Sequence, residues 1–182
     1  MTRPVGTGSR RASVSAVPAG ERRLQDPEAR REHARTLAWQ ALNRRERTEA
    51  ELRALLARKR VAPEDAEAVV RELVGAGFVD DARFAERFAE DRRRLDGWGA
   101  ERIGQRLRAL GIEPELAAAT AGERGHAGEL EAALALLRRR VPKVPETPRE
   151  RDRALGILVR RGYPLELAHD ALRRYAGVPE PD

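Results

Sequence analysis

Apolar residues recur along most of the chain at intervals of three and four residues, the spacing of helices that each bury one face. The first such run carries Ala34, Leu37, Ala38, Ala41 and Leu42, and eight further runs follow. Helix starts and stops fall between the runs, at Asp26-Pro27, Thr48, Pro63, Asp80, Gly97 to Gly99, Gly111, Pro114, Gly122 to Gly128, Val141 to Pro148, Gly162 and Pro164. Period-two alternation is absent, so no strand is predicted.

The pattern repeats with a period of 51 residues. Residues that share this spacing are Leu52, Ile103 and Ala154; Leu56, Leu107 and Leu158; Arg60, Gly111 and Gly162; and Val61, Ile112 and Tyr163. A proline then opens the next helix in each copy, at 63, 114 and 164. A fixed period of this kind is typical of modules that stack on one another to bury their apolar faces.

The predicted fold is therefore all-α, with three tandem three-helix repeats of helix-turn-helix type in an elongated, curved array. We expect a disordered basic tail over 1–25, repeats over 26–79, 80–125 and 126–176, and a frayed end over 177–182. The third repeat contains a proline-rich linker over 141–148. Within the first repeat, Thr48 and Glu51 predict a capping box, in which each side chain bonds the other's backbone amide.

Composition excludes several kinds of protein. The chain has no cysteine, so disulfides, thiol nucleophiles and thiolate metal sites are ruled out. Apolar runs stay far below the roughly 20 residues that span a bilayer, and the first residues lack the apolar core of a secretory signal. We expect a cytoplasmic protein with no contact to membranes.

The net charge of +6 is concentrated at the N-terminus, because residues 1–35 carry 8 basic and 4 acidic side chains. The other 147 residues are therefore close to neutral, at +2. Any nucleic-acid surface must come from local groups of arginines rather than from the overall field.

Residues suited to catalysis or metal binding do not form a recognisable site. His33, His126 and His169 fall in different repeats, without the spacing of metal ligands. Asp80 and Asp81 are better explained as helix-capping groups than as ligands of a cation. We therefore expect a binding protein that has no catalytic residues, no metal and no cofactor.

Clusters of basic residues near helix ends are the candidates for binding. They are Arg44, Arg45, Arg92, Arg93, Arg94, Arg102, Arg106, Arg138, Arg139, Arg140, Lys143, Arg160 and Arg161. Basic side chains in a last turn also stabilise the helix dipole, so each cluster has a structural explanation as well. Their recurrence in every repeat favours a surface for phosphates or for an acidic protein. Trp98, beside one cluster, fits an exposed anchor or a buried core residue equally well.

Four motifs occur in order over residues 36–176. They are Thr48-x-x-Glu51-Leu52-x-x-x-Leu56, Leu73-x-x-x-Gly77-Phe78-Val79-Asp80-Asp81-x-Arg83-Phe84-Ala85, Ile103-x-x-x-Leu107-x-x-x-Gly111-Ile112 and Leu158-x-x-Arg161-Gly162-Tyr163. Together they resemble the RecX family, regulators of the RecA recombinase. Arg60 departs from the pattern, since a glycine is common there, and the linker over 141–148 is longer than usual.

The resemblance implies a modular helical protein that binds the RecA filament and the DNA within it. It also implies limited filament extension and suppressed ATPase, strand exchange and coprotease activity. Asp80, Asp81, Phe84, Gly111 and Gly162 belong to the family motifs and are expected to be structural. We expect a monomer. Two other functions fit the pattern as well: a stand-alone DNA-binding protein and a helical adaptor for another protein.

Overall fold

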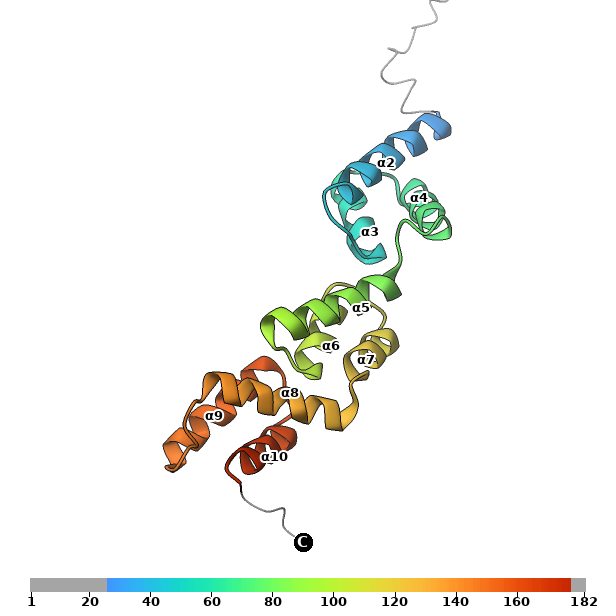
Figure 1. Ribbon diagram of the computed structural model, residues 1–182. Helices are drawn as coiled ribbons and strands as arrows, with labels where there is room; N and C mark the ends of the chain where they lie inside the picture. The colour runs from blue at the N-terminus through green and yellow to red at the C-terminus, as the bar shows by residue number, and fades with distance from the viewer. Residues whose placement is uncertain (1–25, 178–182) are drawn as a thin grey trace, which may run out of the picture.

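The computed structural model describes residues 26–177, and every regular element in that range is a helix (Figure 1). The elements are α2 (Pro27–Leu42), α3 (Glu49–Arg58), α4 (Pro63–Gly75), α5 (Asp81–Asp91), η1 (Arg92–Asp96), α6 (Ala100–Ala109), α7 (Pro114–Gly122), α8 (Gly125–Arg140), α9 (Pro148–Arg161) and α10 (Leu165–Tyr175). The all-helical class is confirmed. The predicted basic tail and the last five residues lie outside the described range.

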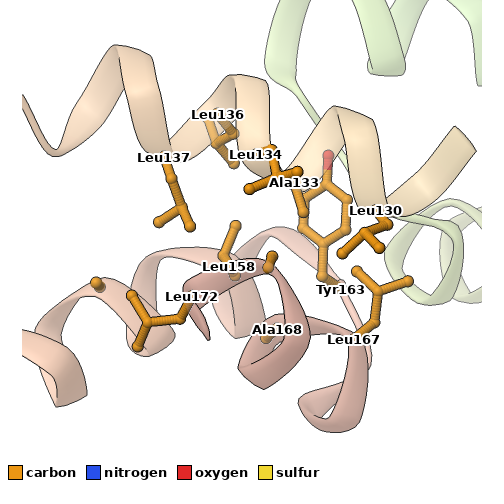
Figure 2. Packing of buried hydrophobic residues seen from close by; sticks show 12 residues of the cluster. Leu130, Ala133, Leu134, Leu136, Leu137, Leu158, Tyr163, Leu167, Ala168 and Leu172 are labelled. Carbon is orange, nitrogen blue, oxygen red and sulfur yellow. The ribbon is translucent and has the colours of Figure 1, made fainter. Parts of the chain in front are cut away.

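Each set of three consecutive helices encloses its own core, and the three sets follow one another in an elongated array (Figure 1). We call them module 1 (α2 to α4), module 2 (α5 to α7, with η1) and module 3 (α8 to α10). Figure 2 shows the third core, where Leu134 and Leu137 from α8 face Leu158 from α9 and Leu172 from α10. Three small cores, rather than one large one, explain the low aromatic content of 4%.

The second helix ends in the same way in every module. Arg60, Gly111 and Gly162 follow α3, α6 and α9, and their φ angles are 61°, 85° and 88°. The next residue in each case donates its amide to a carbonyl five positions earlier, from Val61 to Leu56 over 3.1 Å and equivalently from Ile112 and Tyr163. This left-handed ending is a common way for a helix to satisfy its last carbonyls. The predicted 51-residue period is thus a repeated helix stop.

The first helices keep this period only between modules 1 and 2. Buried Ala34 and Ala38 in α2 correspond to Ala85 and Ala89 in α5, 51 residues later. The matching positions in α8 are Ala133 and Leu137, only 48 residues further on. The proline-rich segment after α8 restores the register by the end of α9, which makes the third module longer between its first and second helices.

Helix capping differs in one place from the prediction. The Thr48 hydroxyl accepts from the Glu51 amide over 3.1 Å, but the Glu51 carboxylate is held by two bonds from Arg45, of 2.7 and 2.9 Å. A complete capping box occurs instead at Thr147 and Glu150, where α9 begins. The linker therefore ends in a well-defined helix start.

Candidate partner-binding surface

The second helices of modules 1 and 2 meet end to end, with the end of α6 against the start of α3. The Thr48 hydroxyl donates to the Leu110 carbonyl over 2.7 Å, and the Glu49 amide donates to Asp81 Oδ1 over 2.9 Å. A helix start carries partial positive charge and a helix end partial negative charge, so this arrangement is electrostatically favourable. Residues from α3, α5 and α6 thus make one joint.

Modules 2 and 3 are joined by the same arrangement. The Gly99 amide donates to the Arg161 carbonyl over 2.8 Å, and the Glu101 amide donates to the Gly162 carbonyl over 3.2 Å. Glu129 takes the role that Asp81 has in the first joint, since its carboxylate accepts from the Ala100 amide over 3.1 Å. Helices α9, α6 and α3 therefore follow one another head to tail.

Close backbone approach explains the glycines of both joints. A Cβ on Gly111 would lie 2.2 Å from the Ala50 Cβ, and a Cβ on Gly162 would lie 2.3 Å from the Arg102 Cβ. A Cβ on Gly99 would lie 2.5 Å from the Gly162 carbonyl oxygen. These contacts leave no room for a side chain, so the glycines are required by the packing as well as by their φ angles.

Several of the candidate arginines make contacts within the protein. The Arg93 side chain is only 7% exposed and donates to the carbonyls of Thr120 and Ala121, both over 2.9 Å. Arg161 donates to the Asp96 carbonyl, and Arg92 pairs with Asp96 over 2.6 Å. Together with Arg45, which holds Glu51, these residues help to position the loop and helix ends around them.

Other candidates lie exposed, and within the described residues they form no ion pair or side-chain hydrogen bond. These are Arg44, Arg106, Arg138, Arg139, Arg140, Lys143 and Arg160. Arg94 is 71% exposed and has only Asp91 of its own helical turn as a partner, over 3.3 Å. All of these but Arg44 belong to modules 2 and 3, so these particular candidates gather toward one end of the array.

The second joint carries a shallow surface hollow of about 450 Å³, lined by Trp98, Arg102, Gln105, Arg106 and Ala109. We call this the Trp98 surface. The Arg102 guanidinium lies 4.4 Å from the centre of the Trp98 ring, and that of Arg92 lies 5.7 Å from it. Cation–π contacts of this kind hold both cations in place. Trp98 is half-buried and also packs edge-on against Phe88, so it combines the two roles considered for it.

Arg102 also connects the Trp98 surface to module 3, because its Nη1 donates to the Arg160 carbonyl over 2.5 Å. Arg139 reaches the same region from α8, with its Nη2 3.4 Å from the position a Cβ on Gly97 would take. Cations from α6, α8 and α9 therefore surround the second joint.

The first joint has a different charge at the same positions. Glu51 and Leu55 stand 51 residues before Arg102 and Arg106, and Glu51 is already paired with Arg45. Arg53 nearby is paired with Glu49 and Glu67. The two joints share a backbone arrangement, but at these matched positions the first carries an acidic and an apolar residue and the second carries two arginines.

The motif residues around Asp80 lie in the first joint and in the core of module 2. Asp80 caps α5 by accepting from the Arg83 amide over 2.9 Å, and Phe84 stacks on Phe88 with ring centres 6.2 Å apart. Burial raises the pKa of Asp81, and the hydrogen bond from the Glu49 amide opposes this effect. Burial likewise raises the pKa of Tyr163 in module 3 to about 12.

Within residues 26–177, no group of three histidine or acidic side chains is placed to hold a metal ion. Over the same range, no helix has the length and apolar character needed to cross a membrane.

Sequence reasoning missed three participants in the joints: Thr48 as a donor, Gly99 and Glu129. The signal for Gly99 was available, because it stands 51 residues after Thr48, at the same step before a second helix. Glu129 gave no such signal, since the register of α8 is shifted by three residues.

Comparison with known proteins places these features in a family. Residues 34–73 match the first three-helix domain of RecX, and residues 80–120 match the second. The fold is similar to the crystal structure of RecX from Lactobacillus salivarius, with a TM-score of 0.74, 13% identity and coverage of 82% of this chain and 98% of that one. A second crystal structure, of a regulatory protein RecX, gives a TM-score of 0.67 at 20% identity, over 85% of this chain and 77% of that one.

Sequence relatives cover most or all of the chain. Regulatory protein RecX of Deinococcus radiodurans is 35% identical over 182 residues, which is 100% of this chain and 87% of the relative. Regulatory protein RecX of Amycolatopsis mediterranei is 34% identical over 149 residues, 81% of this chain and 85% of the relative. The helical modules, their matched domains and this level of identity lead to one conclusion: the chain belongs to the RecX family of regulatory proteins.

Proposed function

We propose that this chain, acting as a monomer, inhibits the RecA recombinase by binding the RecA–DNA filament. Bound there, it limits filament extension and so lowers the ATPase, strand-exchange and coprotease activities. The observation that carries the proposal is the Trp98 surface on an elongated member of a regulatory family. Arg106 lies exposed in this surface and Arg160 lies exposed on the neighbouring α9, and within residues 26–177 neither side chain forms an ion pair or a hydrogen bond.

An elongated array of modules suits a filament better than a small isolated target, because successive modules offer a long, continuous surface for contacts. Exposed arginines bind phosphate oxygens and carboxylates through paired N–H groups. Arg102, held over Trp98, adds a cation whose position is fixed before binding, which lowers the entropy cost of the contact. These features support contact with DNA in the filament, with acidic groups of RecA, or with both.

The primary test is the DNA-dependent ATPase of the RecA from the same organism, measured with increasing amounts of this protein at low and moderate salt. The proposal predicts a fall in ATPase that saturates at substoichiometric to equimolar ratios. Unchanged ATPase at equimolar protein would rule the proposal out, and a rise in ATPase would show that the protein stimulates RecA instead of inhibiting it.

A charge-reversal variant locates the surface. Arg106→Glu with Arg160→Glu alters two exposed side chains but leaves Arg102 on Trp98. We expect about tenfold weaker inhibition. Arg58→Glu with Arg71→Glu, an equal charge change on exposed residues of module 1, is the matched control. Equal losses in the two variants would show a general charge effect and remove the Trp98 surface from the site.

A stand-alone DNA-binding function remains the second candidate, because the same arginines suit phosphates without RecA. It predicts submicromolar binding to duplex or single-stranded DNA by the protein alone. The logarithm of the affinity would then fall steeply with the logarithm of salt, by roughly 0.7 to 0.9 per phosphate contact. A helical adaptor would bind neither RecA filaments nor DNA.

A further inference from the structure

Module 1 has an open cleft at the place where modules 2 and 3 receive their neighbours. In module 2 the space between the start of α5 and the end of α6 holds the start of α3, and in module 3 the equivalent space holds the start of α6. Within the described residues no helix precedes module 1. Its cleft, between α2 and the end of α3, has a volume of about 570 Å³.

The charge of this cleft is opposite to that of its two counterparts. Asp81 and Glu129, on the first helices of modules 2 and 3, each accept from the backbone amide of an incoming helix start. The corresponding residue of module 1 is Arg30, 51 residues before Asp81 and four before the buried Ala34. A helix start carries partial positive charge, so an arginine at this place disfavours the binding of another helix start in the cleft.

Arg60 is a second residue at which the cleft of module 1 differs from its counterparts in modules 2 and 3. It is the one non-glycine residue with a positive φ in residues 26–177, at the position held by Gly111 and Gly162 in the other modules. An L-residue in this conformation costs about 1 kcal/mol or more. In modules 2 and 3 the neighbouring module packs so closely on Gly111 and Gly162 that a Cβ there would clash. The Arg60 side chain lies at the equivalent position at the end of α3. A locally unfavourable residue at such a place indicates a function other than stability.

The remaining lining has two cations at the rim and apolar side chains at the walls. The cations, Lys59 and Arg60, are exposed, as is the neighbouring His33, and within residues 26–177 none of the three forms an ion pair or a side-chain hydrogen bond. The half-buried side chains of Val61 and Ala62 contribute the apolar wall.

Two carboxylates also line the cleft, but both are already held by arginines. Asp65 has a side chain only 2% exposed and receives Arg30 Nε over 2.8 Å, with Arg31 Nε 3.4 Å away. Glu32 pairs with Arg35. The buried Asp65 fixes Arg30 at the cleft. The unpaired charges left to face a ligand are those of Lys59 and Arg60, and both are positive.

We propose that this cleft binds an acidic protein segment that also carries apolar side chains. Its carboxylates pair with Lys59 and Arg60 and its apolar groups contact Val61 and Ala62. The concave shape and apolar wall favour a peptide over the phosphate backbone of a nucleic acid. The chain's own residues 1–25 do not fit by charge, since they carry five arginines and one glutamate. The proposal does not depend on the RecA hypothesis or on the Trp98 surface.

The test uses the full-length protein and two fluorescent probes: a short peptide that repeats Glu-Glu-Leu and a thymidine oligonucleotide. Fluorescence anisotropy gives the affinity of each. Lys59→Glu with Arg60→Gly reverses the charge of Lys59, removes that of Arg60 and gives position 60 the residue found in the other modules. We expect at least about tenfold weaker peptide binding and unchanged oligonucleotide binding. Arg149→Glu with Arg153→Gln, an equal charge change at exposed positions of α9, is the matched control, for which peptide binding stays within about twofold of the parent.

Three results would overturn the proposal: no peptide binding to the parent protein, equal peptide binding to the cleft variant, or a parallel loss of oligonucleotide binding in that variant. A further contrary result is concentration-dependent self-association in sedimentation velocity that the cleft variant abolishes, since the occupant is then a second copy of the chain. His33→Glu, at an exposed helical position, serves as a second variant in case the first fails to fold. It should weaken peptide binding, and an unchanged affinity in this folded variant would count against the cleft.

Discussion

The Thr48 hydroxyl at the start of α3 donates to the Leu110 carbonyl at the end of α6 over 2.7 Å, across 62 residues of sequence. The same hydroxyl oxygen accepts from the Glu51 amide. One fully buried side chain therefore caps a helix in module 1 and ties it to module 2. The residue that caps α3 is thus also the residue that connects modules 1 and 2.

Replacing Thr48 with valine keeps the shape of the side chain but removes both hydrogen bonds. We expect a loss of roughly 2–3 kcal/mol in the free energy of unfolding, because the cap is lost and the part-buried Leu110 carbonyl loses its donor. Thr48→Ser keeps both bonds and should cost less than about 1.5 kcal/mol. Urea unfolding followed by circular dichroism measures both, and equal losses would show that the methyl group matters more than the hydroxyl.

Gly162→Ala tests the close approach of modules 2 and 3. The new Cβ would meet the Arg102 backbone nitrogen at 2.5 Å, and backbone atoms cannot rotate away. We expect a destabilisation of about 3 kcal/mol or more, from the left-handed φ and the clash together. Gly77→Ala is the control, since Gly77 has a φ of 74° but no atom within 4 Å of the new Cβ. It should cost only about 1–2 kcal/mol. Similar losses in thermal or urea unfolding would mean that the joint adjusts.

The run Arg92 to Arg94 offers a matched pair of neighbouring residues. Arg93→Ala leaves the carbonyls of Thr120 and Ala121 without their donor, and should destabilise the protein by roughly 2–3 kcal/mol. Arg94→Ala removes a side chain that is 71% exposed and should change stability by less than about 0.5 kcal/mol. Differential scanning calorimetry separates the two, and a neutral Arg93→Ala would show that these bonds contribute nothing to stability.

Asp81→Asn tests the half-buried carboxylate of the first joint. Its raised pKa means that the folded state holds the proton more tightly than the unfolded state. This group's contribution to stability is therefore fully present below the unfolded pKa of about 3.9 and falls as the pH rises through the folded pKa. An asparagine oxygen still accepts from the Glu49 amide without a charge. We expect Asp81→Asn to gain stability relative to the parent as the pH rises over this window.

Urea midpoints at a series of pH values from acid to neutral measure this difference. Asp81→Ala, which removes the acceptor as well as the charge, should be less stable than Asp81→Asn by about 1 kcal/mol at every pH. A difference between the parent and Asp81→Asn that is independent of pH would contradict the assignment.

Much of the fold follows from sequence, because helix stops depend on local residues. Leu56, Leu107 and Leu158 are fully buried at their predicted period, and the stops at Gly111 and Gly162 form as expected. The three-residue shift of α8 was not predictable from that period. It becomes visible only once Ala133 and Leu137 are seen to fill the places that Ala85 and Ala89 fill in α5.

The candidate surface was harder to predict, because sequence does not show which arginines are already bound. Arg93 and Arg94 are neighbours in the same basic run, yet one is 7% and the other 71% exposed. The cleft at Arg60 was also missed as a site, although its departure from glycine was visible. Its meaning depends on the joints of the other two modules, which appear only in three dimensions.

The head-to-tail line of α9, α6 and α3 has a mechanical consequence (Figure 1). Each module is stiffened by its own core, whereas a joint is crossed by only a few hydrogen bonds. We therefore expect bending to occur at the two joints, which act as hinges, while each module moves as a rigid body. Its curvature on a partner is then set by two angles, and the glycines at the hinges limit how far each can turn.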